Sequence, residues 1–173
     1  MEYLLRKIAR AKWQPSGLLI GSVDELQADV FSACLKTQGN TLSVWLTENT
    51  DWESESVLDI LAALFSTADG PSRTDVVFIK KDTISESGIN ILESKGASSA
   101  IDEINDRHLN LAGLNFSTMK DVASVILKIL SEDSSKSFIK RYNEKQVLAI
   151  VKRRVELKKI NIDTLCSRWK GKL

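Results

Sequence analysis

Apolar residues recur at helical spacing in five segments of the chain. Each segment follows a polar residue that can cap a helix. Ser22 with Glu25 and Thr50 with Glu53 have the spacing of a capping box, in which two side chains accept otherwise unpaired N–H groups at the helix start. We predict helices after the start signals at Ser22, Thr50, Ser98 or Ser99, Thr118 and Asn143, reaching about residues 35, 65, 111, 130 and 158, and a short last one over 163–170. The second helix is apolar over a wide arc, so we expect it to be well buried.

Strand-like segments lie between these helices. Residues 41–47 follow the turn pair Gly39-Asn40 and alternate in part. Residues 75–79 are nearly all apolar, which is typical of a strand covered on both faces, and residues 89–92 form a weaker candidate. Residues 3–13 and 18–20 fit helical and strand periods equally well. The alternation of elements predicts an α/β fold in which helices flank a small mixed sheet, with a helical C-terminal extension.

Composition is that of an ordinary globular protein. The 173 residues are 43% hydrophobic and 27% charged, which excludes disordered and membrane-embedded classes. The longest apolar run, residues 60–65, is too short to cross a bilayer. No apolar segment follows the basic N-terminus as in a secretory signal. We therefore expect a cytoplasmic protein in which the two cysteines, Cys34 and Cys166, are buried reduced thiols.

Charge is distributed unevenly along the chain. Residues 131–137 are polar and serine-rich, and we interpret them as a linker. Residues 136–173 carry twelve Lys or Arg against three acids, whereas residues 1–135 carry twelve bases against twenty acids. We therefore divide the chain into an acidic α/β domain, 1–135, and a basic helical C-terminal extension, 136–173, which could also pack on the same domain.

The basic extension offers the strongest functional clue. On the helix that begins after Asn143, lysines recur every seven residues, and other cations lie beside them. Such a surface could pack against the acidic body or a second copy, bind an acidic protein, or neutralise nucleic-acid phosphates. The contact residues that we predict are Lys140, Arg141, Lys152, Arg153 and Arg154.

Catalytic and metal-binding signals are weak. His108, the single histidine, could serve as a general base for a serine near Ser22 or Ser98. It falls on the apolar face of a predicted helix, however, and no Gly-x-Ser-x-Gly motif presents a nucleophile. Carboxylates spaced four apart, such as Asp102 and Asp106, fit a solvated helix face. We therefore expect no catalytic residue, cofactor or metal.

These observations favour a non-catalytic cytoplasmic interaction protein. It would dock a protein partner or a second copy of itself through the basic C-terminal region. By analogy of size and charge alone, an immunity protein, an antitoxin-like protein or an accessory subunit fits this description. The alternative is a nucleic-acid-binding module that uses the same basic residues. No membrane partner is expected.

Overall fold

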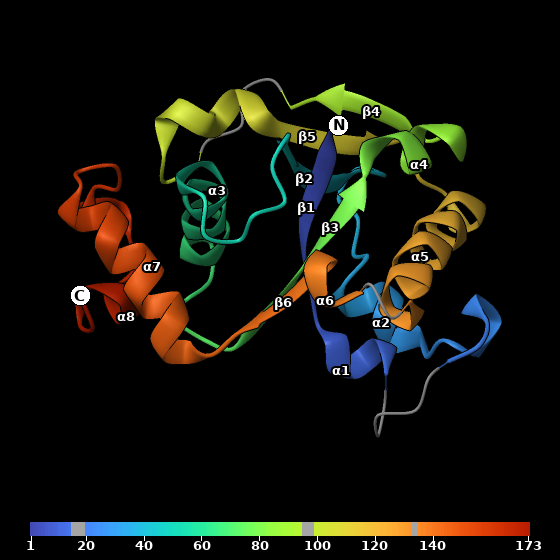
Figure 1. The fold of residues 1–173 in the computed structure, drawn as a ribbon, viewed down its shortest axis with the longest axis horizontal. Coiled ribbons are helices and arrows are strands. Elements are labelled where there is room, and N and C mark those ends of the chain that lie inside the picture. Colours follow the sequence, from blue (N-terminus) through green and yellow to red (C-terminus); the bar gives the residue numbers. More distant parts are fainter. Residues whose placement is uncertain (15–19, 95–98, 133–134) are drawn as a thin grey trace.

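A computed structural model describes residues 1–14, 20–94, 99–132 and 135–173. Within these residues the chain forms a six-stranded sheet in the order β4-β5-β2-β1-β3-β6, and all five strand pairings are antiparallel (Figure 1). The strands are β1 (Tyr3–Ile8), β2 (Leu42–Thr47), β3 (Thr74–Lys80), β4 (Asn90–Glu93), β5 (His108–Ala112) and β6 (Ile139–Tyr142).

Helices cover both faces of this sheet (Figure 1). One face carries α3 (Glu55–Ser66), α7 (Glu144–Glu156) and α8 (Ser167–Lys170); the other carries α1 (Arg10–Trp13), α2 (Ala28–Ala33), α4 (Lys81–Glu86) and α5 (Phe116–Ser131). Short connections contain α6 (Ser135–Phe138) and the 3₁₀ turns η2 (Val23–Glu25), η3 (Asp102–Arg107) and η4 (Ile162–Thr164). Along β3, Val76 and Phe78 enter one core while Val77 and Ile79 enter the other, because side chains alternate across a strand.

The predicted α/β class, with helices flanking a small sheet and helices at the C-terminal end, is confirmed. The predicted strands at 41–47, 75–79 and 89–92 are β2, β3 and β4. Asn143 and Gln146 form the capping box that opens α7. The sheet is antiparallel where a mixed one was expected. Neighbouring strands run in opposite directions, so no pair in it requires a parallel crossover.

Two predicted helices are wrong, and the last one, over 163–170, is divided into η4 and α8 by extended backbone at Leu165 and Cys166. Residues 23–35 contain η2 and the short α2 instead of one helix, because Leu26 and Gln27 adopt extended backbone between them. Residues 101–111 form η3 and then β5. Leu109 and Leu111 alternate into a core, and β5 pairs with β2 on one side and β4 on the other. Pairing with two neighbours outweighs a local helical period.

Two segments fit helical and strand periods equally well, and the structure describes all of the first but only Ile20 of the second. Residues 3–13 form β1 followed by the single turn α1, and residues 18 and 19 lie outside the described part of the chain, as do Ser98 and residues 133–134 of the proposed linker.

The basic segment is continuous with the rest of the fold. Residue 136 lies within α6, after which β6 joins the sheet edge beside β3. Helix α7 packs against α3, and Val147 and Val151 share a core with Ile60 and Phe65.

Candidate functional site

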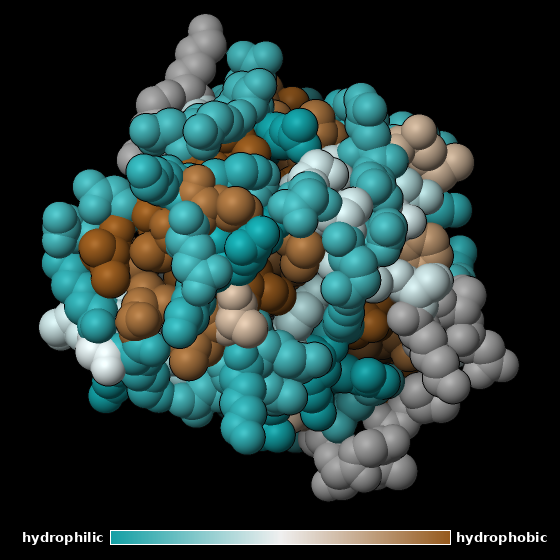
Figure 2. All heavy atoms as spheres, turned by 60° about the vertical axis from the view of Figure 1, so that its left-hand side comes forward, coloured by the Kyte–Doolittle hydropathy of each residue, from teal (hydrophilic) through white to brown (hydrophobic). Residues whose placement is uncertain are grey.

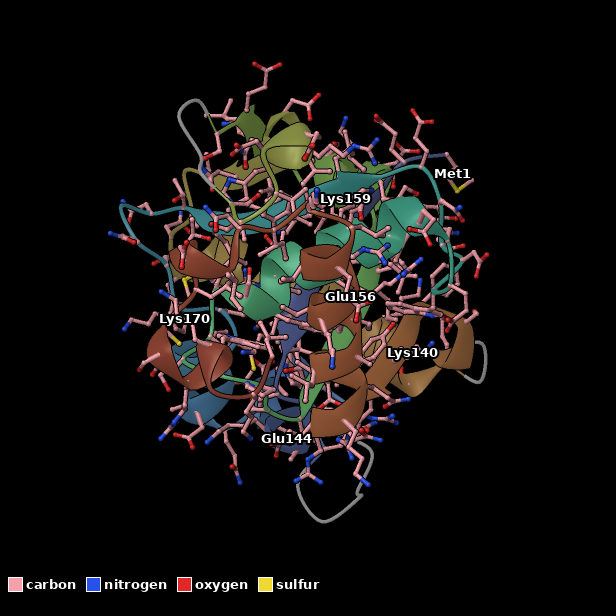
Figure 3. All side chains as sticks on the ribbon, turned by 90° about the vertical axis from the view of Figure 1, so that its left-hand side faces the viewer. Met1, Lys140, Glu144, Glu156, Lys159 and Lys170 are labelled. Atoms are coloured by element: carbon pink, nitrogen blue, oxygen red, sulfur yellow. The ribbon has the colours of Figure 1, made fainter. Side chains whose placement is uncertain are left out.

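The five predicted contact residues lie in different environments. Arg154 is buried on the inner side of α7, with 2% of its surface exposed. Lys140 and Arg141 lie on β6, and Lys152 and Arg153 lie on the solvent side of α7. Figure 3 faces this side of the molecule. Arg154 is therefore excluded from any docking surface, and the five residues do not form one exposed stripe.

Arg154 instead lies at the centre of an ion-pair network between α7 and α3. Its Nε donates to Asp59 Oδ1 at 2.8 Å, and its Nη2 donates to Glu55 Oε2 at 2.8 Å. Lys159 Nζ donates to the second Asp59 oxygen at 2.6 Å. The Asp59 side chain is only 12% exposed, whereas that of Glu55 is 73% exposed. The Asp59 contact is thus the desolvated part of this network.

The two β6 cations also pair with acids of the body. Lys140 forms an ion pair with Glu53, and Arg141 Nε donates to Asp75 Oδ1 at 2.6 Å. The hydrogen bond and the charge of Asp75 raise the pKa of Arg141 above its ordinary value. These contacts join the basic segment to the acidic body, so part of its charge is neutralised within the molecule.

A set of cations remains on the outer side of α7. Lys145, Lys152 and Arg153 are exposed there, and we call them the cationic face. Arg153 lies 3.7 Å from Glu156, and both side chains are more than half exposed. Neither lysine forms an ion pair with a residue that the structure describes. Figure 2 turns toward this side of the molecule and shows a mainly hydrophilic surface with hydrophobic residues between the polar ones.

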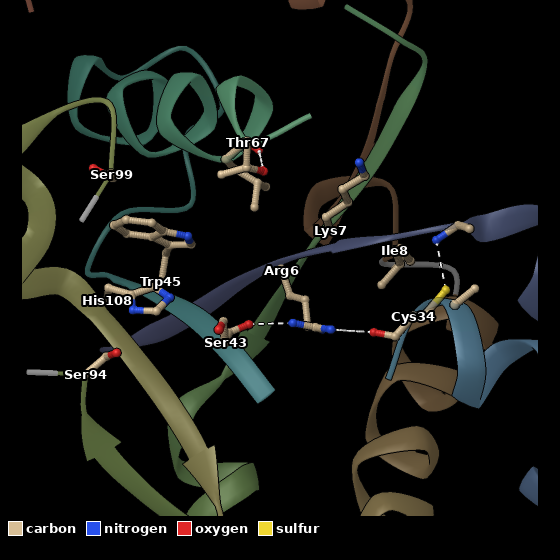
Figure 4. Close-up of a pocket in the computed structure, with 13 residues that line it drawn as sticks. Arg6, Lys7, Ile8, Cys34, Ser43, Trp45, Thr67, Ser94, Ser99 and His108 are labelled. Carbon is tan, nitrogen blue, oxygen red and sulfur yellow. Dashed lines mark hydrogen bonds between the residues drawn. The ribbon is translucent and has the colours of Figure 1, made fainter. Parts of the chain in front are cut away.

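A second candidate lies where β1 and β2 diverge. Their pairing ends at Leu5 and Trp45, although β1 continues beside β3 as far as Ile8. Two adjoining cavities of about 600 and 390 Å³ open at this gap and share Arg6, Ser43, Ser94 and His108. Figure 4 shows residues that line the larger one. We call the combined space the Arg6 cavity.

Arg6 fills the gap between the strands with its guanidinium. Nη1 donates to the Ser43 carbonyl, while Nε and Nη2 donate to the Cys34 carbonyl (Figure 4). Burial lowers the pKa of Arg6 to about 10, because desolvation disfavours the cation. Every hydrogen bond that Arg6 makes in the described structure therefore ends on a neutral acceptor, and no carboxylate compensates the charge.

His108 lies on the wall of this cavity beside Trp45. The two residues are directly opposite each other on β5 and β2, and their ring centroids are 4.8 Å apart. Burial lowers the pKa of His108. Its Nδ1 is buried and has no hydrogen-bond partner among the described groups. The cavity also contains Ser94 and Ser99. The Ser94 backbone N–H donates to the His108 carbonyl at 3.2 Å, but among the described groups neither serine side chain forms a hydrogen bond with the His108 ring.

Sequence reasoning missed Arg6. Its signal is positional: Arg6 occupies the alternate position between Leu4 and Ile8, both of which enter the core. A cation at a core-facing strand position requires buried acceptors or a bound anion. The ambiguity of residues 3–13 concealed this alternation.

The cysteines and the possible metal ligands do not form a further site among the described residues. Cys34 is buried as predicted, whereas Cys166 is exposed, and both thiols are free. No three His, Cys, Asp or Glu side chains among the described residues cluster as metal ligands. The helices found in the described ranges are all too short or too polar to span a membrane. Comparison with protein-family models, curated proteins and solved structures finds no match to this chain.

Proposed function

We propose that the protein is a cytoplasmic, non-catalytic interaction protein that docks an acidic protein surface on the cationic face of α7. The supporting observation is the division of charge across this helix. On the inner side, Arg154 is matched by Asp59 and Glu55. On the outer side, Lys145 and Lys152 project to solvent without an ion-pair partner in the described residues.

The spacing of these lysines suits an extended acidic surface. Seven residues along a helix correspond to about 10 Å and two turns, so both side chains lie on one side. An arriving carboxylate need not displace an internal partner from either lysine. Exposed ion pairs contribute about 0.2–1 kcal/mol each, so this face gives weak, salt-sensitive docking that other contacts must complete.

The test compares two charge-reversed double variants. Lys145→Glu with Lys152→Glu removes the cationic face. Lys80→Glu with Lys128→Glu makes the same change in net charge at exposed lysines on β3 and α5. Poly-L-glutamate is the acidic probe, titrated at low and near-physiological salt. We expect the first variant to bind it at least about fivefold more weakly than wild type, equivalent to about 1 kcal/mol, and the second to bind like wild type.

Equal binding by both variants would remove the cationic face from the account. Tighter binding of wild type to a short DNA duplex than to poly-L-glutamate would replace the acidic protein with nucleic acid, which the same lysines could bind through phosphates. Light scattering adds a further arm. A dimer that dissociates only in the Lys145/Lys152 variant would identify a second copy as the acidic partner.

A further inference from the structure

The Arg6 cavity has an unusual charge balance for this protein. Residues 14–135 carry nineteen acids and eight bases. Nevertheless, the described lining of the cavity includes three cations, Arg6, Lys7 and Lys36, and no carboxylate. Lys7 and Lys36 are exposed, and neither forms an ion pair with a described residue. The positive potential here therefore remains available to a ligand.

The wall of the cavity adds hydrogen-bonding groups. Asn110 Nδ2 donates to Ser94 Oγ at 3.2 Å, and Ser43 Oγ lies 3.4 Å from Asn110 Oδ1. Ser43 and Asn110 occupy the face of β2 and β5 that bears Trp45 and His108, and Ser94 follows the end of β4. Apolar atoms come from Ile8 and from Leu64, at the end of α3. A ligand would thus meet cations on one side and a mixed polar and apolar wall on the other.

The volume of the cavity favours an organic ligand over a bare ion. Ligand pockets commonly measure about 300–1,000 Å³, and the larger part of this one measures about 600 Å³. A phosphate monoester carries close to two negative charges at neutral pH and offers three acceptor oxygens. Arg6, Lys7 and Lys36 supply donors and charge that match such a group better than a single carboxylate.

We propose that the Arg6 cavity binds a small organic phosphate monoester, with the phosphate at Arg6, Lys7 and Lys36 and the organic part against the wall that contains Trp45 and His108. Arg6 is held in place before the ligand arrives by the carbonyls of Ser43 and Cys34. Because the fold already holds the Arg6 side chain in place, little side-chain entropy is lost when a ligand binds to it, which favours binding. This site is separate from the cationic face of α7, so either proposal can fail without the other.

His108 provides a built-in reporter of the site, because it is the only histidine in the chain. Its ring proton signal is followed by NMR while AMP, inorganic phosphate or adenosine is added. We expect AMP to shift the signal saturably and to raise the pKa of His108, since a nearby anion favours the imidazolium. Inorganic phosphate should act more weakly, and neutral adenosine should have no effect at the same concentration.

Variants link the shift to the proposed contacts. Replacing Arg6 could unfold the strand gap, so the main variant is Lys7→Glu with Lys36→Glu, both at exposed positions. It should weaken AMP binding at least tenfold, whereas Lys80→Glu with Lys128→Glu should leave it unchanged. An unchanged His108 signal at about 10 mM AMP, well above a 1 mM Kd, would overturn the proposal. An equal response to adenosine, or normal AMP binding by the Lys7/Lys36 variant, would do the same.

Discussion

Replacing Asp59 by alanine should strongly destabilise the protein. Asp59 is the desolvated carboxylate of the α3–α7 network and accepts from both Arg154 and Lys159. Once it is removed, Lys159 can turn to solvent, since its side chain is 34% exposed. Arg154 cannot, because its side chain is 2% exposed. The variant therefore leaves a buried guanidinium whose nearest carboxylate is the largely solvated one of Glu55.

The size of the loss follows from this difference in burial. Removing one partner of a buried ion pair costs about 3–5 kcal/mol, whereas an exposed pair contributes about 0.2–1 kcal/mol. We therefore expect Asp59→Ala to lower the free energy of unfolding by about 3–5 kcal/mol, and Glu55→Ala to lower it by about 1 kcal/mol or less. In a chain of this length the Asp59 variant should melt roughly 6–20 °C below wild type.

Urea unfolding of wild type and the two single variants measures these differences. A third variant, Asp59→Leu with Arg154→Met, replaces both buried charges with apolar side chains and should recover most of the lost stability, because neither charge is then left unpaired. A loss below about 1 kcal/mol for Asp59→Ala, or equal losses for Asp59→Ala and Glu55→Ala, would refute the reasoning that Arg154 depends on a desolvated partner.

Three further predictions concern local conformation and pH. Gly88 has φ +73° with open space around it, so Gly88→Ala should lower the free energy of unfolding by about 1–2 kcal/mol through backbone strain alone. Thermal unfolding measures this loss, with Gly21→Ala as the unstrained control, and equal losses in the two variants would contradict the prediction. Burial lowers the pKa of His108, so as the pH falls this histidine is protonated in the unfolded chain before it is protonated in the folded one. The free energy of unfolding should therefore fall as the pH drops below about 6.5. His108→Gln should weaken this pH dependence, and an unchanged slope would contradict the prediction. Burial, then the charge of Glu53, raises the pKa of Tyr142, so stability should fall as pH rises above about 10; an ultraviolet titration in which Tyr142 ionises near that pH would contradict this.

Capping residues and apolar spacing predicted the helices whose apolar side is also buried by the rest of the fold. Asn143 and Gln146 close a capping box at α7, and the apolar positions that follow do bury one side of that helix. The apolar run in α3 is likewise buried. Residues 101–111 show the limit: apolar side chains at helical spacing coexist there with the alternation of Leu109 and Leu111. Only the neighbouring strands, contributed by distant parts of the chain, decide between the two periods.

The positions of individual charges were harder to predict. Arg154 lies three residues after Val151 and seven after Val147, on the side of α7 that the valines bury. That spacing could have placed it inside, but its partner Asp59 is 95 residues away. Arg6 had a comparable signal between Leu4 and Ile8. Its acceptors belong to Cys34 and Ser43, which a single sequence does not associate with it.

The proposed function assigns different roles to the two sides of the basic segment: the inner side binds the protein's own acids, and the outer side would dock a partner. Poly-L-glutamate binding at low salt should separate them when measured on Asp59→Leu with Arg154→Met and on Lys145→Glu with Lys152→Glu. The first variant should bind like wild type, because its changes lie inside the fold, and the second should lose affinity. Loss of affinity in the first with retention in the second would contradict this division of charge.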